Sequence, residues 1–176
     1  MANVKLDWES VKFAASDVSG WVSFRKCVGV NENSKLLSNK AVYVIRLARP
    51  FAFDYNGSAS PVAYIGRGQA QKRITSHLKT WISEISKRIP DVKIEIFFCE
   101  PKIRKLGKIC DHVEADLLNK FRDEFGKTPL RNKNLPRKIG NHNYVKSELG
   151  KLRCGKGKGF HWAIKPLPSS PFFRRG

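Results

Sequence analysis

The chain has 176 residues, 41% of them hydrophobic, and its 34 lysines and arginines far outnumber its 15 aspartates and glutamates. This length suits one globular domain with extensions, and the apolar runs fall far short of the roughly 20 residues that a membrane-spanning helix needs. The net charge of +19 predicts a polyanionic partner. Because no long basic amphipathic helix stands out, nucleic acid is favoured over a membrane surface.

The cysteines are scattered, without the CxxC spacing of a metal or redox site, at Cys27, Cys99, Cys110 and Cys154. They predict reduced thiols in a cytoplasmic protein. The first ten residues, "MANVKLDWES", contain acids where a signal peptide has its apolar stretch, which agrees with that location. A metal site formed by Cys154, His142 and His161 is a weaker alternative, because their spacing matches no known finger pattern.

Residues 1–40 hold dispersed aromatic and apolar side chains, and we expect them to form an extension packed on a core that follows. Within them, "DWESVKFAA" (7–15) is compatible with a short helix, for which Asp7 is a candidate cap. The core is expected to span residues 41–135.

Two strands are predicted at the start of this core. The stretch "AVYVIRLA" (41–48) is apolar and rich in β-branched residues, which is typical of a mostly buried strand. The second strand is "VAYIG" (62–66). Residues 49–61 carry prolines near both ends and "NGS" between them, which indicates a loop or a hairpin arm. The simplest arrangement of the two strands is antiparallel.

Two helices and a third strand complete the predicted core. A helix over about 69–89 has apolar residues at helical spacing and ends at Pro90. A strand over 92–100 alternates apolar and polar side chains, and a second helix over about 108–125 ends at a glycine. The β-β-α-β-α order predicts an α/β (α+β) fold with a small, mostly antiparallel three-stranded sheet flanked by helices.

The region from residue 127 to 176 carries 13 lysines and arginines and a single acid, Glu148. Its frequent prolines and glycines predict irregular structure, in which aromatic side chains act as anchors or stacking groups. We expect residues 136–176 to be a basic C-terminal extension that contacts nucleic acid electrostatically.

Glu114 is the most informative residue of the second helix. At about 100° per residue, Leu118, Phe121 and Phe125 lie within about 40° of it, so the carboxylate sits at one end of the apolar stripe. A buried charge is costly unless it is paired. Glu114 is therefore either an ion-pair or capping residue, favoured by the helix dipole, or a metal ligand that faces a cleft.

Other polar residues are individually unspecific. Arg73 and His77 lie four residues apart on one side of the first helix, which also suits a solvated cationic face. Tyr43 and Tyr64 suit ordinary core positions in strands.

Taken together, these residues form a recognisable series: "AVY" (41–43), "YIG" (64–66), "KRITSH" (72–77), then Glu114 and an asparagine beyond it. The series resembles the GIY-YIG endonucleases over about 95 residues, and "YIG" is identical, whereas "AVY" keeps only the tyrosine of Gly-Ile-Tyr. The 20 residues between the two tyrosines are more than is usual, as in the restriction enzymes of that family.

The resemblance implies a role for each matched residue. Tyr43 would act as general base or position the attacking water, its pKa lowered by nearby cations, and Arg73 would clamp a phosphate oxygen. His77 would orient or deprotonate a tyrosine, and Glu114 would hold a single Mg²⁺ or Mn²⁺. The implied catalytic set is Tyr43, Tyr64, Arg73, His77, Glu114 and an asparagine, with Asn132 preferred over Asn134.

Further residues are candidates for contact with the nucleic acid. Gly66 and Gly68 would keep side-chain atoms away from its backbone, while Arg67 between them either contacts a flanking phosphate or faces solvent. The segment "RNKNLPRKIGNHN" (131–143) offers side chains suited to phosphates or base edges. The candidate nucleic-acid-binding residues are Arg67, Arg131, Lys133, Arg137 and Lys138.

The function expected from this resemblance is metal-dependent hydrolysis of phosphodiester bonds in double-stranded DNA, by an endonuclease of restriction or phage and mobile-element type. Two alternatives stay open: an RNA-directed nuclease or toxin, and a basic binding module on the same fold that does not cut.

Overall fold

A four-stranded antiparallel sheet forms the centre of the protein, whose computed structural model describes residues 3–32, 34–55, 58–89, 91–102, 109–136, 142–152 and 162–164. The strand order is β2-β7-β3-β6. These strands are β2 (Glu9–Ala14), β3 (Val42–Leu47), β6 (Val62–Arg67) and β7 (Lys93–Cys99). The mixed α+β class with an antiparallel sheet, predicted from the sequence, is confirmed.

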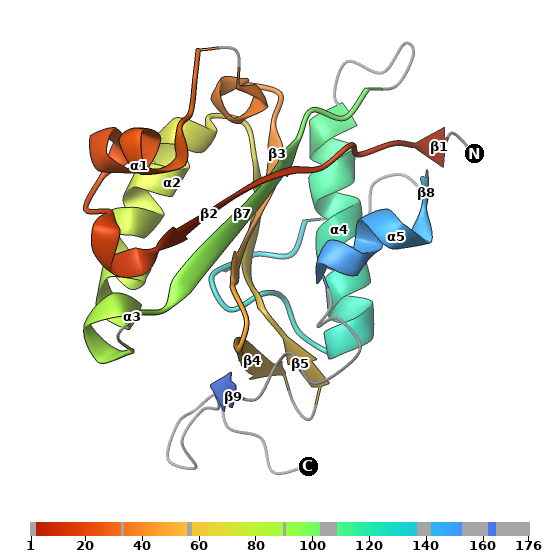
Figure 1. Cartoon of the computed structure of the whole chain (residues 1–176). Coiled ribbons are helices and arrows are strands. Elements are labelled where there is room, and N and C mark those ends of the chain that lie inside the picture. Colours follow the sequence, from red (N-terminus) through yellow and green to blue (C-terminus); the bar gives the residue numbers. More distant parts are fainter. Residues whose placement is uncertain are drawn as a thin grey trace.

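Helices cover both faces of this sheet (Figure 1). One face is covered by α1 (Trp21–Val28), α2 (Ala70–His77) and α3 (Ser83–Arg88). The other is covered by α4 (Ile109–Phe125), beside which lies the short α5 (Lys146–Leu149). Short 3-10 turns occupy Ala15–Asp17, Lys35–Leu37 and Gly150–Leu152.

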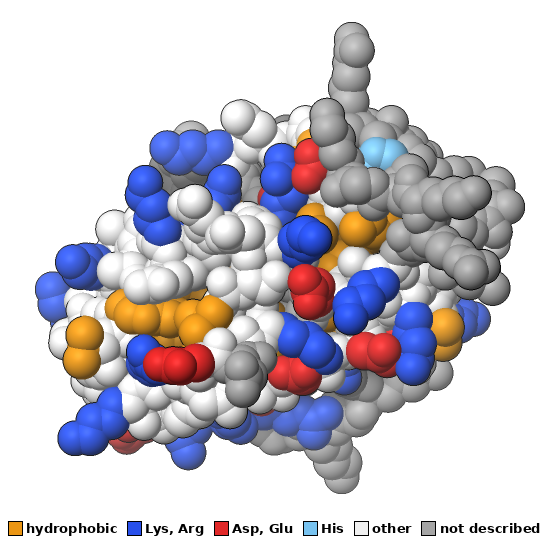
Figure 2. Space-filling view, turned by 90° about the horizontal axis from the view of Figure 1, so that it is seen from above, with side chains coloured by type: hydrophobic (Ala, Val, Ile, Leu, Met, Phe, Trp, Pro, Cys, Tyr) orange, Lys and Arg blue, Asp and Glu red, His pale blue; other side chains and the backbone are white. Residues whose placement is uncertain are grey.

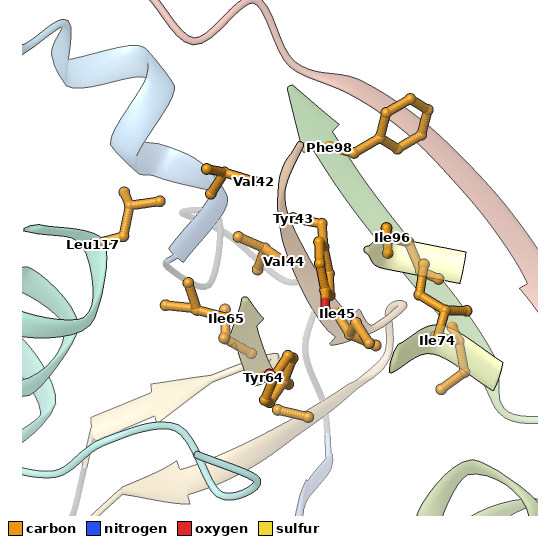
Figure 3. Close-up of a cluster of buried hydrophobic side chains, with 14 of the residues drawn as sticks. Val42, Tyr43, Val44, Ile45, Tyr64, Ile65, Ile74, Ile96, Phe98 and Leu117 are labelled. Atoms are coloured by element: carbon orange, nitrogen blue, oxygen red, sulfur yellow. The ribbon is translucent and has the colours of Figure 1, made fainter. Parts of the chain in front are cut away.

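Strand β3 lies inside the sheet, paired with β7 on one side and with β6 on the other, and its side chains are largely buried on both faces. Val42 and Val44 point towards α4, while Tyr43 and Ile45 point towards α2, as Figure 3 shows. This alternation is what a period of two residues requires. The two-sided apolar character of 41–48 therefore reflects a strand sandwiched between two helical layers, and the predicted antiparallel pairing of β3 with β6 is confirmed.

The expected helix within residues 7–15 is wrong, because Glu9–Ala14 form strand β2. This strand pairs antiparallel with β7 over all six residues, from Glu9 opposite Phe98 to Ala14 opposite Lys93. Val11 and Phe13 alternate with polar residues and face the core, a period of two that outweighs the weak capping signal at Asp7. The sheet consequently has four strands where three were expected.

The expected single helix over 69–89 is interrupted. Between α2 and α3, residues Leu78–Ile82 form a π-helical turn, inside which Thr80 has non-helical backbone angles of φ −111° and ψ −105°. The Thr80 hydroxyl donates to the Ser76 carbonyl oxygen at 2.8 Å, a local bond that competes with the regular helical pattern. In contrast, α4 is continuous, and Gly126 follows it with φ +73°, as its expected role as the terminating glycine requires.

Two small sheets join distant parts of the chain. The arm at 49–61 is a hairpin of β4 (Phe51–Tyr55) and β5 (Ser58–Ser60), and β9 (Trp162–Ile164) runs parallel to β4. At the N-terminal side, β1 (Asn3–Val4) pairs parallel with β8 (Asn143–Tyr144). The basic region after residue 127 is therefore not wholly irregular. Among the described residues, no helix has the length and apolar character needed to cross a membrane.

Candidate active site

The two tyrosines of the resemblance converge over Gly66. Tyr43 on β3 lies opposite Gly66 on β6, and its ring centroid is 6.0 Å from that of Tyr64. A Cβ atom added to Gly66 would lie 2.5 Å from Cε1 of Tyr64 and 2.9 Å from each tyrosine hydroxyl. Glycine at this position is thus required by the side chains of Tyr43 and Tyr64, two of the buried side chains labelled in Figure 3.

The structure gives each of the two glycines a reason within the fold itself. Gly66 makes room for the two tyrosine side chains, and its approach to a nucleic-acid backbone stays a prediction. Gly68 has φ +75°, in the left-handed region, and an added Cβ would make only an ordinary contact at 3.8 Å with the Asn39 carbonyl oxygen. Its conformation, which other L-residues rarely adopt, turns the chain from β6 into α2.

Tyr43 is buried beside Tyr64, within electrostatic range of Arg73 and Glu114. Its side chain is fully buried, and its hydroxyl has no hydrogen-bond partner among the described residues. Burial raises the pKa of Tyr43 well above its ordinary value, and the opposing effect of Arg73 is too small to reverse this. The expectation that neighbouring cations lower this pKa is wrong for the chain by itself, so the hydroxyl remains protonated at neutral pH.

Arg73 connects α2 to the strand that carries Tyr64. Its Nη1 donates a hydrogen bond to the Tyr64 hydroxyl at 2.9 Å. The residue as a whole is exposed, and a guanidinium carries five N–H donors in a planar fork. The bond to Tyr64 fixes the fork in place while other donors remain able to bind an oxyanion.

His77 packs beside Tyr64 in the same cluster as Tyr43 and Arg73, and its imidazole is uncharged. Its ring lies 4.3 Å from the Tyr64 ring, and its Nδ1 is 3.0 Å from the indole Nε1 of Trp81. Burial, reinforced by the charges of Arg131 and Arg73, lowers the pKa of His77 to about 4. At neutral pH the imidazole is therefore uncharged, and it does not help to lower the pKa of Tyr43 as expected.

Glu114 lies on α4 and is engaged by Arg67. Its Oε2 is 3.0 Å from Nε of Arg67, whose Nη1 is 3.0 Å from Oδ1 of Asp111. Burial raises the pKa of Glu114, while the charges of Arg67 and then Arg73 oppose the shift. Arg67 was expected at a phosphate or in solvent, but it bridges two carboxylates. Asp111 was missed, although its place three residues before Glu114 puts both on one helix face.

The Asn132 side chain binds backbone rather than the tyrosine cluster. Its Oδ1 accepts from the Ile65 N–H at 2.9 Å, and its Nδ2 donates to the Ile65 carbonyl oxygen at 2.7 Å. The backbone N–H of Arg131 also donates to Ala63. Asn132 thus completes the free edge of β6 and positions the strand that carries Tyr64, whereas Asn134 is exposed.

The other candidate nucleic-acid-binding residues are exposed or lie outside the described part of the chain. Arg131 and Lys133 are exposed, while Arg137 and Lys138 lie outside the described residues. Figure 2 views the end of the molecule where β3 and α4 begin, and lysine and arginine side chains are spread over it with acids between them. This mixture of charges agrees with the bridging of Asp111 and Glu114 by Arg67.

Within the described ranges, no group of three or more histidine, cysteine, aspartate or glutamate side chains is arranged to hold a metal ion. His142 instead places Nδ1 2.9 Å from Oδ2 of Asp116, which also accepts from the Tyr144 hydroxyl at 2.8 Å. Cys154 and His161, the other members of the alternative metal site, lie outside the described residues.

The structure therefore groups Tyr43, Tyr64, Arg73 and His77 from three elements, with Glu114 close enough to affect the pKa of Tyr43 and of Arg73.

In comparisons with known proteins, no family model, curated protein or solved structure matches this chain.

Proposed function

We propose that the protein is a metal-dependent endonuclease that hydrolyses phosphodiester bonds in DNA, with a site of the GIY-YIG type. One observation carries the proposal: the Tyr64 hydroxyl accepts a hydrogen bond from Arg73, the Tyr64 ring packs at a tilt against His77, and the hydroxyls of Tyr64 and Tyr43 converge over Gly66. The amino-acid sequence shows only that these residues occur in the expected order along the chain. Their contact through β3, β6 and α2 is what a shared reaction centre would need.

Arg73 is the group that would bind the scissile phosphate. Its exposed guanidinium, fixed by the Tyr64 hydroxyl, can present further N–H donors to the phosphoryl oxygens. Charge grows on these oxygens as the water attacks, so a preorganised cation lowers the barrier. The Tyr43 hydroxyl, without a partner among the described residues, is suited to donate to or orient a water molecule.

The carboxylates at the start of α4 fit a hard divalent ion. Asp111 and Glu114 already hold a cationic group, the Arg67 guanidinium, and Mg²⁺ is commonly bound by one or two carboxylates together with phosphate oxygens. When bound, such an ion would polarise a phosphate oxygen and offset its growing charge. Arg67 would have to give up its bond to Glu114 in exchange.

A non-cleaving nucleic-acid-binding module is the second candidate. Two features favour it: Glu114 is paired with Arg67, and the Tyr43 side chain is fully buried. If both arrangements persist with nucleic acid bound, the residues would serve the fold alone. In that case the protein would bind DNA or RNA through its net charge of +19 without cutting it.

A cleavage assay on the purified full chain separates these functions. Supercoiled plasmid and total RNA are incubated with and without Mg²⁺, and the products are compared with those of Glu114→Gln. We expect metal-dependent plasmid cleavage that Glu114→Gln abolishes, with DNA binding unchanged or tighter because a negative charge is removed. Asp123→Asn, an exposed acid on the same helix, is the matched control and should cut normally.

Each other outcome contradicts a stated part of the proposal. Cleavage of RNA but not plasmid would favour the RNA-directed nuclease. Binding without cleavage of either would favour the binding module. Normal cleavage by Glu114→Gln would remove Glu114 from the site, and loss of folding in that variant would assign its carboxylate to the ion pair with Arg67.

A further inference from the structure

The π-helical turn Leu78–Ile82 follows directly on His77, the last residue of α2. Such turns insert a residue into a helix, change the direction of the side chains that follow, and are frequent at functional sites. Here the turn contains Trp81, which is 9% exposed and packed into the core. Its indole nitrogen Nε1 lies 3.0 Å from Nδ1 of His77.

The chemistry of the two rings fixes the direction of this hydrogen bond. An indole N–H can only donate, and a neutral imidazole has one nitrogen that donates and one that accepts. Nδ1 of His77 must therefore carry the lone pair that accepts from Trp81. The hydrogen of the neutral imidazole is then on Nε2, so the bond selects one of the two tautomers.

The other groups around His77 act against a second proton on the ring. The Tyr64 phenol lies against it at a centroid distance of 4.3 Å, and that hydroxyl accepts from Arg73. The charged groups that act on His77 are the guanidiniums of Arg131 and Arg73, both of which disfavour an imidazolium. The ring is thus a neutral group packed against a phenol and within range of two cations.

We propose that Trp81 is a positioning residue that holds His77 as the Nε2–H tautomer, so that His77 serves the site as a neutral hydrogen-bond donor and not as a base. With Nδ1 occupied by the indole and Nε2 protonated, neither nitrogen is free to take a proton from a tyrosine or a water. Of the roles that the resemblance implied for His77, orientation of its neighbours is retained and deprotonation is excluded.

A neutral donor suits a site that binds phosphate. An N–H group directed at an oxyanion stabilises the charge that develops in a transition state without itself changing protonation. The assignment of the tautomer depends only on the contacts of His77, whereas the identity of the bound oxygen as one of a phosphodiester rests on the proposed function.

Nitrogen NMR of the full chain tests the tautomer without any substrate. In ¹⁵N-labelled protein at pH 7, long-range correlation spectra distinguish protonated from unprotonated ring nitrogens, and His77→Gln identifies the His77 signals among the four histidines. We expect an unprotonated Nδ1 and a protonated Nε2. A protonated Nδ1, or equal populations of the two tautomers, in the wild-type protein would overturn the proposal whether or not the protein cuts DNA.

Trp81→Phe tests the positioning role, because it keeps an aromatic ring and removes the N–H. We expect a mixture of tautomers at His77, and a cleavage rate about tenfold lower at saturating DNA, since one hydrogen bond is worth up to about 1.5 kcal/mol. Trp8→Phe is the matched control: it removes an indole N–H that donates to the Glu148 carbonyl oxygen, and it should change neither quantity.

The two proposals fail separately. A Trp81→Phe variant that keeps the wild-type tautomer, or that cuts at the wild-type rate, contradicts the role of Trp81 while the nuclease function stands. If no nucleic acid is cut by the wild-type protein, the nuclease function fails and the spectra still decide the tautomer. Should Trp81→Phe fail to fold, the wild-type spectrum still decides the tautomer, and the absence of a coupling across the hydrogen bond from Trp81 Nε1–H to His77 Nδ1 in that spectrum would contradict the role of Trp81.

Discussion

Tyr43 has the least usual environment among the proposed catalytic residues, because it is fully buried and its hydroxyl has no hydrogen-bond partner in the described part of the chain. An unsatisfied buried hydroxyl costs free energy of folding. Tyr55 offers the opposite case, since its hydroxyl donates to Val62 and accepts from the Leu130 N–H. Substitutions at Tyr43 and Tyr55 can therefore distinguish an effect on the cleavage rate from an effect on the stability of the fold.

Tyr43→Phe should lower the cleavage rate and leave the fold at least as stable. Removal of the unpaired hydroxyl should raise the free energy of unfolding by about 1 kcal/mol, while loss of a group that acts on the attacking water typically costs 10²–10⁴-fold in rate. The measurements are urea unfolding and plasmid cleavage. Tyr55→Phe should show the reverse, with lower stability and a normal rate. Normal cleavage by Tyr43→Phe would exclude Tyr43 from the chemistry.

His77 predicts a specific dependence of stability on pH. Its pKa of about 4 in the folded protein lies below the ordinary value of 6.5, so unfolded chains bind more protons between these values. The free energy of unfolding should therefore fall as the pH is lowered from about 6.5 to 4. The difference between wild type and His77→Gln in urea unfolding isolates this contribution. A difference that stays constant over that range would contradict the neutral, buried imidazole.

At the scale of elements, the free edge of β6 determines where Tyr64 and Gly66 lie. The β6 strand pairs with β3 on one side, and on the other the side chain of Asn132 makes two hydrogen bonds to Ile65. An edge strand without such a partner exposes unpaired backbone groups. Asn132 thus stabilises the edge of the sheet. Its effect on the proposed reaction centre is indirect, through the position of β6.

Asn132→Ala should destabilise the protein by about 2 kcal/mol, since it removes two hydrogen bonds worth about 1 kcal/mol each. Exchange of the Ile65 amide hydrogen should become faster as the edge opens. Asn134→Ala changes an exposed asparagine in the same segment and should stay within about 0.5 kcal/mol of wild type. Equal effects of the two substitutions would show that the contact with Ile65 does not hold the edge.

In the molecule as a whole, described residues from the N-terminal and C-terminal regions are joined to the rest of the fold. The Glu148 carboxylate accepts from the Leu6 N–H at 2.8 Å, and the buried Ser60 hydroxyl donates to the Leu152 carbonyl oxygen at 2.6 Å. In addition, β9 adds a strand to the hairpin arm through Trp162–Ile164. Deletion of the whole basic region would consequently remove structural contacts together with charge, so charge substitutions are the cleaner test of binding.

The exposed cations on either side of Asn132, Arg131 and Lys133, should contribute more to DNA binding than equal charges elsewhere. Counterion release lowers log K by about 0.9 per neutralised phosphate for each unit of log salt on B-DNA. Arg131→Gln with Lys133→Gln should therefore reduce the salt slope by about 1.8 if each contacts a phosphate. Lys87→Gln with Arg88→Gln, on α3, removes the same charge and should change the slope little. Equal slopes for both double variants would indicate that only net charge matters.

Elements with local signals could be predicted from the amino-acid sequence alone. The β-branched run at 41–48, the alternation at 92–100 and the apolar stripe before Gly126 predicted β3, β7 and α4, and the structure confirms them. Their periods reflect which faces are buried, and this information lies within a few residues of each position. The residues of the proposed site could be selected as well, but only through a resemblance in their order.

Tertiary structure decided the features that depend on residues distant in the chain. Strand β2 exists because β7 offers it an edge some 80 residues away, and Arg67 is bound because α4 brings Asp111 and Glu114 to the end of β6. The protonation of Tyr43 and of His77 is likewise set by burial and by cations from other elements. Such pairings and desolvation are non-local, and no periodicity within one segment encodes them.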